Sequence, residues 1–260
     1  MPTKINKTKM TGTREWAKSN INIQFGCEHN CRYCYARYDA VHRFKHCTAD
    51  QWVNPVIDWH KASKTYHKRN GTIMFPSTHD ITPANLQACE LLLSRLLRVG
   101  NEILVVSKPH FECIKRICDR FSDCKDLITF RFTIGSANDD VLNFWEPNAP
   151  GFLERISCLD YAYSNGFETS VSCEPFLNGE ISFLYQIAQP FITKSFWIGK
   201  LRDFDRRVDL MDITSEQMDK YVKPLKFAQT DTFICALYEQ LNGQPFIKWK
   251  DSIRVIMNSH

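Results

Sequence analysis

Hydrophobic and polar residues alternate in short segments of this chain, and longer segments between them carry apolar residues at helical spacing. The first alternation, Asn20–Phe25, places Ile21, Ile23 and Phe25 on one side and predicts a β-strand with one buried face. Five more strands are expected at Thr72–Phe75, Glu102–Val106, Leu127–Thr133, Thr169–Cys173 and Ser195–Ile198. The pattern therefore predicts six short strands distributed over most of the chain.

Helices are expected between these strands. The clearest begins at Thr82, with Pro83 at the first helical position, and runs to about Arg98. The others start at about Ala36 and cover about His110–Phe121, Phe152–Ser164, Ile181–Ala188, Ser215–Lys226 and Asp231–Leu241. Strands that alternate with helices form βαβ units and a parallel sheet. Six units are too few for a closed eight-unit barrel, so we predict an α/β fold with a partial (β/α)6 TIM-type barrel and a helical C-terminal extension.

The pattern divides the chain into a basic N-terminal tail (1–18), the partial barrel (19–205) and an extension that packs on the barrel (206–260). Hydrophobic residues make up 43% of the 260 residues, which suffices for one full core. The net charge of +4 does not by itself imply nucleic acid. The tail is the most basic part and carries Lys4, Lys7, Lys9, Arg14 and Lys18. A solvated tail is favoured here, and a phosphate-binding arm is the alternative.

Neither a secretory signal nor a membrane span is visible as an apolar run, so we expect a cytoplasmic protein that does not enter a membrane. Eleven cysteines then need an explanation. An odd count in a chain without a signal argues against a disulfide framework. The cysteines are therefore expected to be buried apolar residues or metal ligands.

Three cysteines stand together directly after the first predicted strand. Cys27, Cys31 and Cys34 have the spacing C-x3-C-x2-C. Three thiolates on one loop can hold three irons of a 4Fe-4S cluster and leave the fourth iron open to a cofactor or substrate. The alternative is a closed zinc site in which His29 or His42 supplies the fourth ligand. The three-cysteine spacing favours the cluster.

This motif, with Tyr33 as the aromatic residue before the last cysteine, resembles the signature of the radical S-adenosylmethionine (radical SAM) superfamily. The resemblance implies that the open iron binds S-adenosyl-L-methionine (SAM) and that reductive cleavage yields a 5′-deoxyadenosyl radical, which abstracts hydrogen from a substrate. It also implies that Tyr33 lies near the adenine. An electron donor such as flavodoxin or ferredoxin is the partner that this chemistry implies.

Later segments resemble the spore photoproduct lyase-like branch, also described as DNA repair photolyase-like. Ser77, Thr78 and Asp80 after the second strand resemble its serine-threonine-aspartate segment, and Ser107-Lys108-Pro109 resembles its threonine-lysine-serine element. Trp145–Gly151 resembles a proline-rich connection of the same branch. The resemblance covers about residues 20–200. It implies that Ser77 and Thr78 contact the cofactor and that Lys108 neutralises the cofactor carboxylate.

Further candidates lie at the ends of later strands, where a barrel of this type carries its chemistry. Thr133 is a candidate for a ribose or carboxylate contact, and Glu174 is a candidate for binding cofactor or substrate. Cys173 is a candidate hydrogen-atom donor, although a buried spectator is the simpler interpretation. Lys200 and Arg202 follow a flexible glycine and suit an anionic group, with plain surface charge as the alternative.

One departure from the branch limits the function. The chain reads Met74-Phe75-Pro76 where photoproduct lyases carry a hydrogen-donating cysteine, which disfavours repair of thymine photoproducts. The subfamily resemblance and the basic tail make a nucleic acid or nucleotide the leading substrate. A peptide-modifying radical SAM enzyme, or a zinc-binding or nucleic-acid-binding protein without radical chemistry, are the alternatives.

Overall fold

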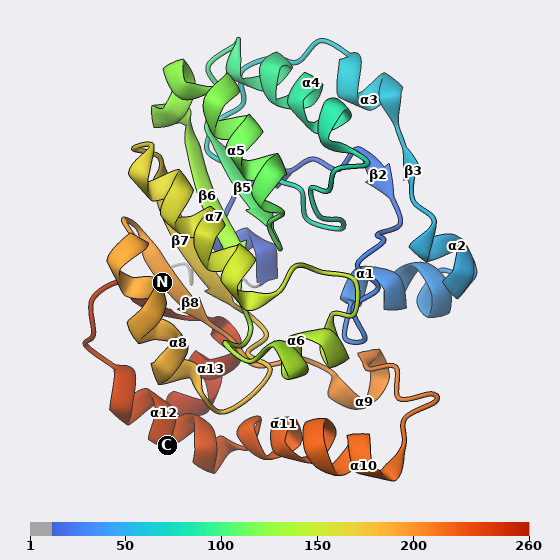
Figure 1. Cartoon of the computed structure of the whole chain (residues 1–260), viewed down its shortest axis with the longest axis vertical. Coiled ribbons are helices and arrows are strands. Elements are labelled where there is room, and N and C mark those ends of the chain that lie inside the picture. Colours follow the sequence, from blue (N-terminus) through green and yellow to red (C-terminus); the bar gives the residue numbers. More distant parts are fainter. Residues whose placement is uncertain (1–11, 260) are drawn as a thin grey trace, which may run out of the picture.

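A single sheet of seven parallel strands forms the centre of the computed structural model, which describes residues 12–259. The strands lie in the order β1-β4-β5-β6-β7-β8-β9, so the barrel is open between β1 and β9. Figure 1 shows the middle of this sheet, from β5 to β8. Their bounds are β1 Ser19–Asn20, β4 Ile73–Phe75, β5 Ile103–Ser107, β6 Ile128–Thr133, β7 Glu168–Cys173, β8 Ser195–Ile198 and β9 Ile247–Trp249. Beside them, β2 (Gln24–Phe25) pairs antiparallel with β3 (Val56–Ile57). The predicted fold class, a partial parallel barrel, is confirmed.

Helices cover the outer face of the sheet, and α5, α7 and α8 lie in front of strands β5–β8 in Figure 1. The helices before β6 are α1 Tyr35–Tyr38, α2 Ala49–Val53, α3 Trp59–Ser63, α4 Leu86–Leu97 and α5 Phe111–Arg120. Those after it are α6 Asp139–Trp145, α7 Phe152–Ser164, α8 Ile181–Ala188, α9 Phe204–Arg207, α10 Ser215–Gln217, α11 Lys223–Ala228, α12 Asp231–Leu241 and α13 Asp251–Met257. None of these helices is both long and apolar enough to cross a membrane.

Alternate residues of the strands separate into two packing layers. Ile73, Phe75 and Val105 belong to the large core under the helices. Met74, Leu104 and Val106 face the other way and pack against Trp16 and Ala17 from the N-terminal segment. This period of two places the second set inside the barrel. Residues from before the first strand therefore help to fill the barrel interior.

The first predicted strand is shorter than expected. Ile21 and Ile23 are buried as the alternation requires, but ladder pairing ends at Asn20. Asn22 instead turns its side chain to the loop after β4, where its Oδ1 accepts hydrogen bonds from the Ser77 and Thr78 backbone N–H groups at 2.7 and 3.1 Å. The hydrophobic pattern thus predicted the burial of Ile21 and Ile23 correctly and overestimated the length of the first strand.

Two helix predictions also change. Thr82 does not cap α4, because the Thr82 backbone N–H donates to Asn85 Oδ1 at 2.9 Å and residues 82–85 form a turn before the helix. The expected helix Ser215–Lys226 is divided by a π-helical turn at Met218–Val222. The predicted helical extension also contains a strand, β9, which adds a seventh member to the sheet beside β8.

The segment before β1 lies against the barrel where it is described. Glu15 is nearly fully buried, and its carboxylate pairs with Lys250 at 3.1 Å and with Arg254 at 2.7 Å. Residues 1–11 of the predicted basic tail, with Lys4, Lys7 and Lys9, lie outside the described residues. The division into tail, barrel and extension stays a prediction.

Candidate active site

A cavity of about 570 Å³ opens at the carboxyl ends of the strands, within the size range of small-molecule sites. It is lined by eleven of the strand-end and loop candidates from the sequence: Cys27, Cys31, Tyr33, Cys34, Ser77, Thr78, Lys108, Thr133, Glu174, Lys200 and Arg202. Cys173, another of these candidates, is fully buried at the end of β7 and is not among the described lining residues. The fold thus brings side chains from the cysteine loop and from the segments at the ends of five strands to one cavity.

The cysteine loop is held against α2 at its start. The Cys27 backbone N–H donates to the Trp52 carbonyl at 2.9 Å. Gly26, just before it, has φ +86°, and a Cβ there would lie 2.5 Å from that same carbonyl oxygen. Only glycine fits both the left-handed backbone and the close approach. The first cysteine is therefore positioned by a turn that other residues would disturb.

Replacing Gly26 with alanine is expected to lower the free energy of unfolding by more than about 1–3 kcal/mol, because backbone strain and a clash with a carbonyl add together. Gly243→Ala is the matched control, since Gly243 has φ +87° with nothing within 4 Å of the added Cβ. Urea denaturation of both variants separates the two costs. Equal losses would show that the contact with α2 does not constrain the loop.

The far side of the loop is held by the connection that follows α6. The Arg32 backbone N–H donates to the Trp145 carbonyl at 2.9 Å, and Asn148 Nδ2 donates to the Glu28 carbonyl at 2.8 Å. The Tyr33 hydroxyl donates to the buried carboxylate of Glu146. The proline-rich segment, which the sequence marked as structural, thus supports the cysteine loop.

Glu146 is in turn paired with Arg155 of α7, at 2.5 Å between Oε2 and Nη2. Both side chains are fully buried. Arg155 also donates to the carbonyl oxygens of Pro150 and Thr133, at 2.7 and 3.1 Å. A buried guanidinium with this many acceptors satisfies the rule that buried charges are paired and hydrogen-bonded. It joins the loop that carries Tyr33 to the end of β6.

Asp80 connects the cysteine loop to the end of β5. Its Oδ1 accepts from the Lys108 backbone N–H at 2.8 Å and from Ser107 Oγ at 3.2 Å. Its Oδ2 lies 3.1 Å from Lys108 Nζ and 2.8 Å from His29 Nδ1. Burial opposes ionisation, but Lys108 and then His29 hold the pKa of Asp80 well below its usual range. The same pairing holds the pKa of Lys108 well above its usual value against the effect of burial.

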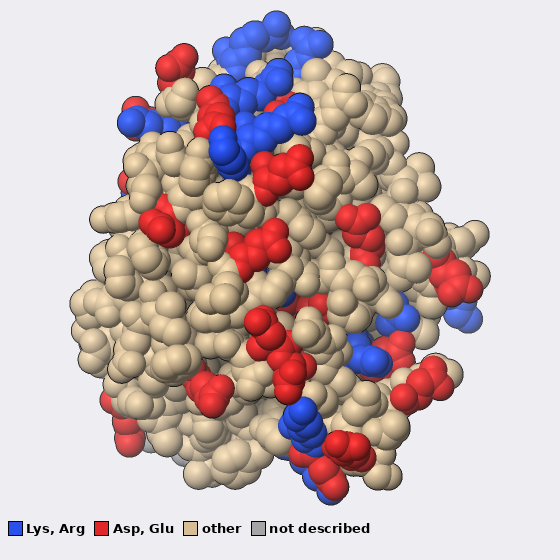
Figure 2. Space-filling view, in the orientation of Figure 1, with Lys and Arg blue, Asp and Glu red and all other residues tan. Residues whose placement is uncertain are grey.

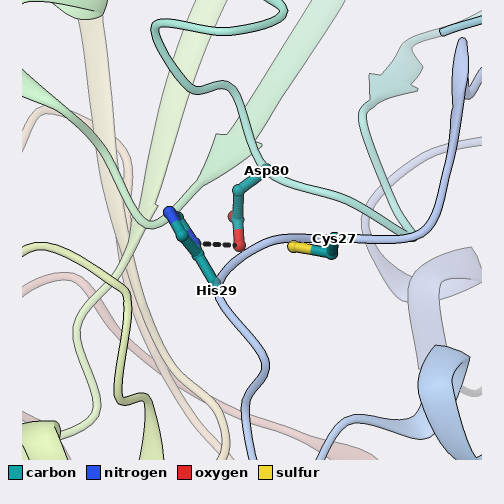
Figure 3. A group of neighbouring side chains, drawn as sticks. All are labelled: Cys27, His29 and Asp80. Carbon is teal, nitrogen blue, oxygen red and sulfur yellow. Dashed lines mark hydrogen bonds and ion pairs between the residues drawn. The ribbon is translucent and has the colours of Figure 1, made fainter. Parts of the chain in front are cut away.

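Cys27, His29 and Asp80 point toward one another, with one ligand atom from each within 4.8 Å of the others (Figure 3). Both ring nitrogens of His29 already have partners, since Nε2 lies 3.0 Å from His110 Nε2. His42, the other candidate fourth ligand for zinc, is exposed, packs at a tilt against Tyr38 and is not among the described lining residues of the cavity. Neither of these two histidines is therefore placed with a free ring nitrogen beside the cysteines to complete a closed Cys3His site.

Burial disfavours the ionised form of all three thiols. Burial, and then the charge of Asp80, raises the pKa of Cys27 to about 12. Burial also raises the pKa of Cys31 and of Cys34. Thiols bind metal as thiolates, so occupation by iron would release their protons. The donor set, three soft ligands on one loop facing a cavity, fits an iron–sulfur cluster with one open position.

Ser77 and Thr78 line the cavity from the loop after β4. Ser77 Oγ accepts from Asn22 Nδ2 at 2.9 Å and from Asn20 Nδ2 at 3.1 Å. The Ser77 carbonyl accepts from the Tyr35 hydroxyl at 2.6 Å, which ties this loop to the helix after the cysteines. The loop is therefore held by asparagines that the sequence analysis did not single out.

Glu174 lies at the other end of the cavity. Its Oε2 is 3.3 Å from Lys250 Nζ, and burial raises the pKa of Glu174 although Lys250 lowers it. Thr133 lines the same wall from the end of β6. Lys250 and Trp16 also line the cavity, and neither was predicted from the sequence. Nothing in the local pattern marks either, because they reach the cavity only through the parallel pairing of β9 and the packing of the N-terminal segment.

Comparisons with known proteins agree on the architecture. No family model matches this chain. An uncharacterized protein of Methanocaldococcus jannaschii is 26% identical over 194 residues, which are 74% of this chain and 70% of that protein. The structure of spore photoproduct lyase with the dinucleoside spore photoproduct matches at a TM-score of 0.55 and 14% identity, over 88% of this chain and 75% of the lyase. A variant of that lyase with bound AdoMet and the dinucleoside matches at a TM-score of 0.50 and 14% identity, over 87% and 74%. The resemblance to the spore photoproduct lyase-like branch is thus confirmed at the level of the fold.

Proposed function

We propose that this chain is a radical SAM enzyme of the spore photoproduct lyase-like branch, with a nucleic acid or nucleotide as its substrate. One observation carries the proposal: Cys27, Cys31 and Cys34 line the same cavity as Lys108 and its partner Asp80. A loop that only binds a metal does not need a cavity of this size beside it. A cofactor that binds both the open iron of a cluster and a cation of the protein needs such a cavity.

The three cysteines would hold the cluster, and SAM would lie between them and Lys108. When bound, this pair of cofactors supplies one-electron cleavage of SAM and hydrogen abstraction from the substrate. The residues of the protein bind the cofactor and orient it. Lys108 presents an ammonium that Asp80 fixes, so that a carboxylate can approach a preformed positive charge. Tyr33 presents its ring to the cavity while Glu146 holds its hydroxyl.

A nucleic-acid or nucleotide substrate is supported by two observations. The matching lyase structure carries a dinucleoside photoproduct. In this chain the cavity lining contains six cationic side chains and two carboxylates, which favours an anionic molecule. Met74-Phe75-Pro76 stands where photoproduct lyases carry a hydrogen-donating cysteine, so we do not expect repair of the thymine lesion itself. Cys173 remains the candidate for a donor in this chain, at the buried end of β7.

The test is anaerobic purification and reconstitution, followed by analysis of iron, sulfide and zinc. With dithionite and SAM, the reconstituted protein is expected to form methionine and 5′-deoxyadenosine. Stoichiometric zinc without iron or sulfide would favour the zinc-binding alternative. An intact cluster that yields no 5′-deoxyadenosine would contradict the proposed enzyme.

Lys108→Met is expected to weaken SAM binding by about tenfold to a hundredfold, which corresponds to the loss of a charge-assisted pair with the carboxylate. Calorimetry of SAM with the reconstituted proteins measures this change. Lys115→Met is the control, because Lys115 pairs only with Asp119 on the exposed face of α5. Unchanged SAM affinity in Lys108→Met, with normal iron content, would assign Lys108 to support of Asp80 alone.

A further inference from the structure

The cations that line the cavity fall into two groups. Lys108 and Lys250 pair with carboxylates that also line or border the cavity, the first with Asp80 and the second with Glu15 and Glu174, and Lys108 is already assigned to the cofactor carboxylate in the proposed function. The second group is formed by the remaining four cationic side chains of the lining: Arg14, Lys200, Arg202 and Arg207. These four come from the N-terminal segment and from the connection after β8. We call them the cation cluster.

The carboxylates beside this cluster leave much of its charge available. Lys200 Nζ lies 3.7 Å from Asp231, which is largely exposed, and screening by water makes such a pair weak. Arg207 pairs with Asp203 one helical turn away, at 2.9 Å. Arg202 has the strongest partner, the buried carboxylate of Asp251. The cluster therefore carries more positive charge than its neighbours neutralise.

Arg14 is the least compensated of the four. Within residues 12–259 its side chain has no ion pair or hydrogen bond, although it lines the cavity. Its backbone is nevertheless anchored on both sides. The Gly12 carbonyl accepts from Lys250 Nζ at 2.8 Å, and Glu15 and Trp16 are fixed by Lys250, whose ammonium lies 4.1 Å from the centre of the Trp16 ring. Arg14 is exposed, so its guanidinium is accessible to a ligand that enters the cavity.

We propose that the cation cluster is a subsite for a phosphate group of the substrate, the phosphate of a nucleotide or of a single strand. The inference rests on the proposed function and adds the residues that recognise the substrate. Three of the four cations have a carboxylate partner, so the cluster keeps about one unit of uncompensated positive charge. A phosphate suits this arrangement because it offers several acceptor oxygens, which an arginine can bind in pairs. The segment after β8 and the N-terminal segment thus select substrates by charge.

Another basic surface serves as the comparison. Figure 2 shows Lys and Arg side chains gathered over α4 and α5, with acidic side chains among them. Arg116 and Arg120 there pair with Glu90, and Lys115 pairs with Asp119. These helix positions are not part of the cavity lining. Arg98 and Lys115 therefore provide a matched pair of cations for a control variant.

The experiment measures fluorescence anisotropy of a labelled thymidine hexanucleotide with the reconstituted protein over a range of salt concentrations. Arg14→Gln/Lys200→Gln is expected to weaken binding about tenfold or more at low salt and to reduce the salt slope by about 0.7, because about 0.7 of a counterion is released for each phosphate that is neutralised on a single strand. Arg98→Gln/Lys115→Gln should bind like the unaltered protein. Thymidine 5′-monophosphate should compete, and thymidine should compete at least about tenfold less well.

Three outcomes would overturn the subsite: equal competition by thymidine and its monophosphate, an unchanged salt slope in Arg14→Gln/Lys200→Gln, or equal losses in both double variants. Stronger competition by an acidic peptide than by the nucleotide would also overturn it, in favour of a peptide substrate. Formation of 5′-deoxyadenosine by the unaltered protein without oligonucleotide is measured in parallel. If the protein cleaves SAM but fails the binding test, the proposed function stands and the phosphate subsite is wrong. If it passes the binding test but does not cleave SAM, the subsite binds phosphate and the proposed enzyme activity is wrong.

Discussion

Replacing Cys31 with alanine is expected to remove nearly all cluster iron and to lower 5′-deoxyadenosine formation by at least about a hundredfold. Altering residues behind a metal ligand commonly costs tenfold to a hundredfold, so the loss of a ligand itself exceeds that range. Cys31 is almost fully buried on the loop between β2 and α1, and no other described thiol lies beside it except Cys27 and Cys34 of the same cavity lining. Two thiolates leave two irons of the cluster without protein ligands.

Iron and sulfide per chain, together with 5′-deoxyadenosine by mass spectrometry, check this result. Cys47→Ala is the matched control, because Cys47 is a partly buried free cysteine near the same helices and outside the cavity lining. It should retain both iron and activity. Full iron in Cys31→Ala, with zinc absent, would place the cluster on other cysteines and contradict the motif.

Arg155→Met is expected to lower the free energy of unfolding by about 3–5 kcal/mol, the largest stability effect we predict. Both members of the Arg155–Glu146 pair are fully buried, so removing the guanidinium leaves a carboxylate in the core without a counter-charge. The carbonyls of Pro150 and Thr133 lose their donors as well. Because Glu146 also holds the Tyr33 hydroxyl, iron incorporation should fall together with stability.

Urea denaturation measures the change. Arg155→Met/Glu146→Gln should recover a substantial part of the loss, since the uncompensated charge is gone and an amide oxygen still accepts from Tyr33. Lys220→Met, which breaks the exposed pair with Asp140, should leave unfolding almost unchanged. A small effect of Arg155→Met would mean that Glu146 takes up a proton or water at little cost.

The sequence predicts best where one local rule determines the outcome. Helices α7, α8 and α12 have the predicted bounds, and β8 matches residue for residue, because each has a regular pattern between clear ends. The prediction of the first strand is wrong in length, because Ile21 and Ile23 are buried but the residue pairing with β4 ends at Asn20. Strand β9 was missed because three residues, Ile247–Trp249, form a strand only when β8 is beside them.

The residues of the site also separate into those that the sequence predicts and those that it does not. The cysteine loop, Lys108 and Glu174 are placed together because loops at the carboxyl ends of parallel strands meet at one edge. The sequence places Asp80 in a motif but does not predict its role, because its partners His29 and Lys108 are far from it in sequence. Lys250 could not be predicted as a cavity residue for a similar reason. Its contacts with Glu15 and Glu174 depend on the completed barrel.

The contact between Lys250 and the N-terminal segment has a consequence for biosynthesis. The ammonium of Lys250 and the carbonyl of Gly12 are 238 residues apart in the chain. A ribosome adds residues in order, so the cysteine loop is synthesised early. Glu15 and Trp16 can contact Lys250 only after nearly the whole chain has been made. Until β9 pairs with β8, Lys250 cannot take its place in the cavity lining. A nascent chain would therefore expose its cysteines to metal and oxygen long before it could shelter a cluster.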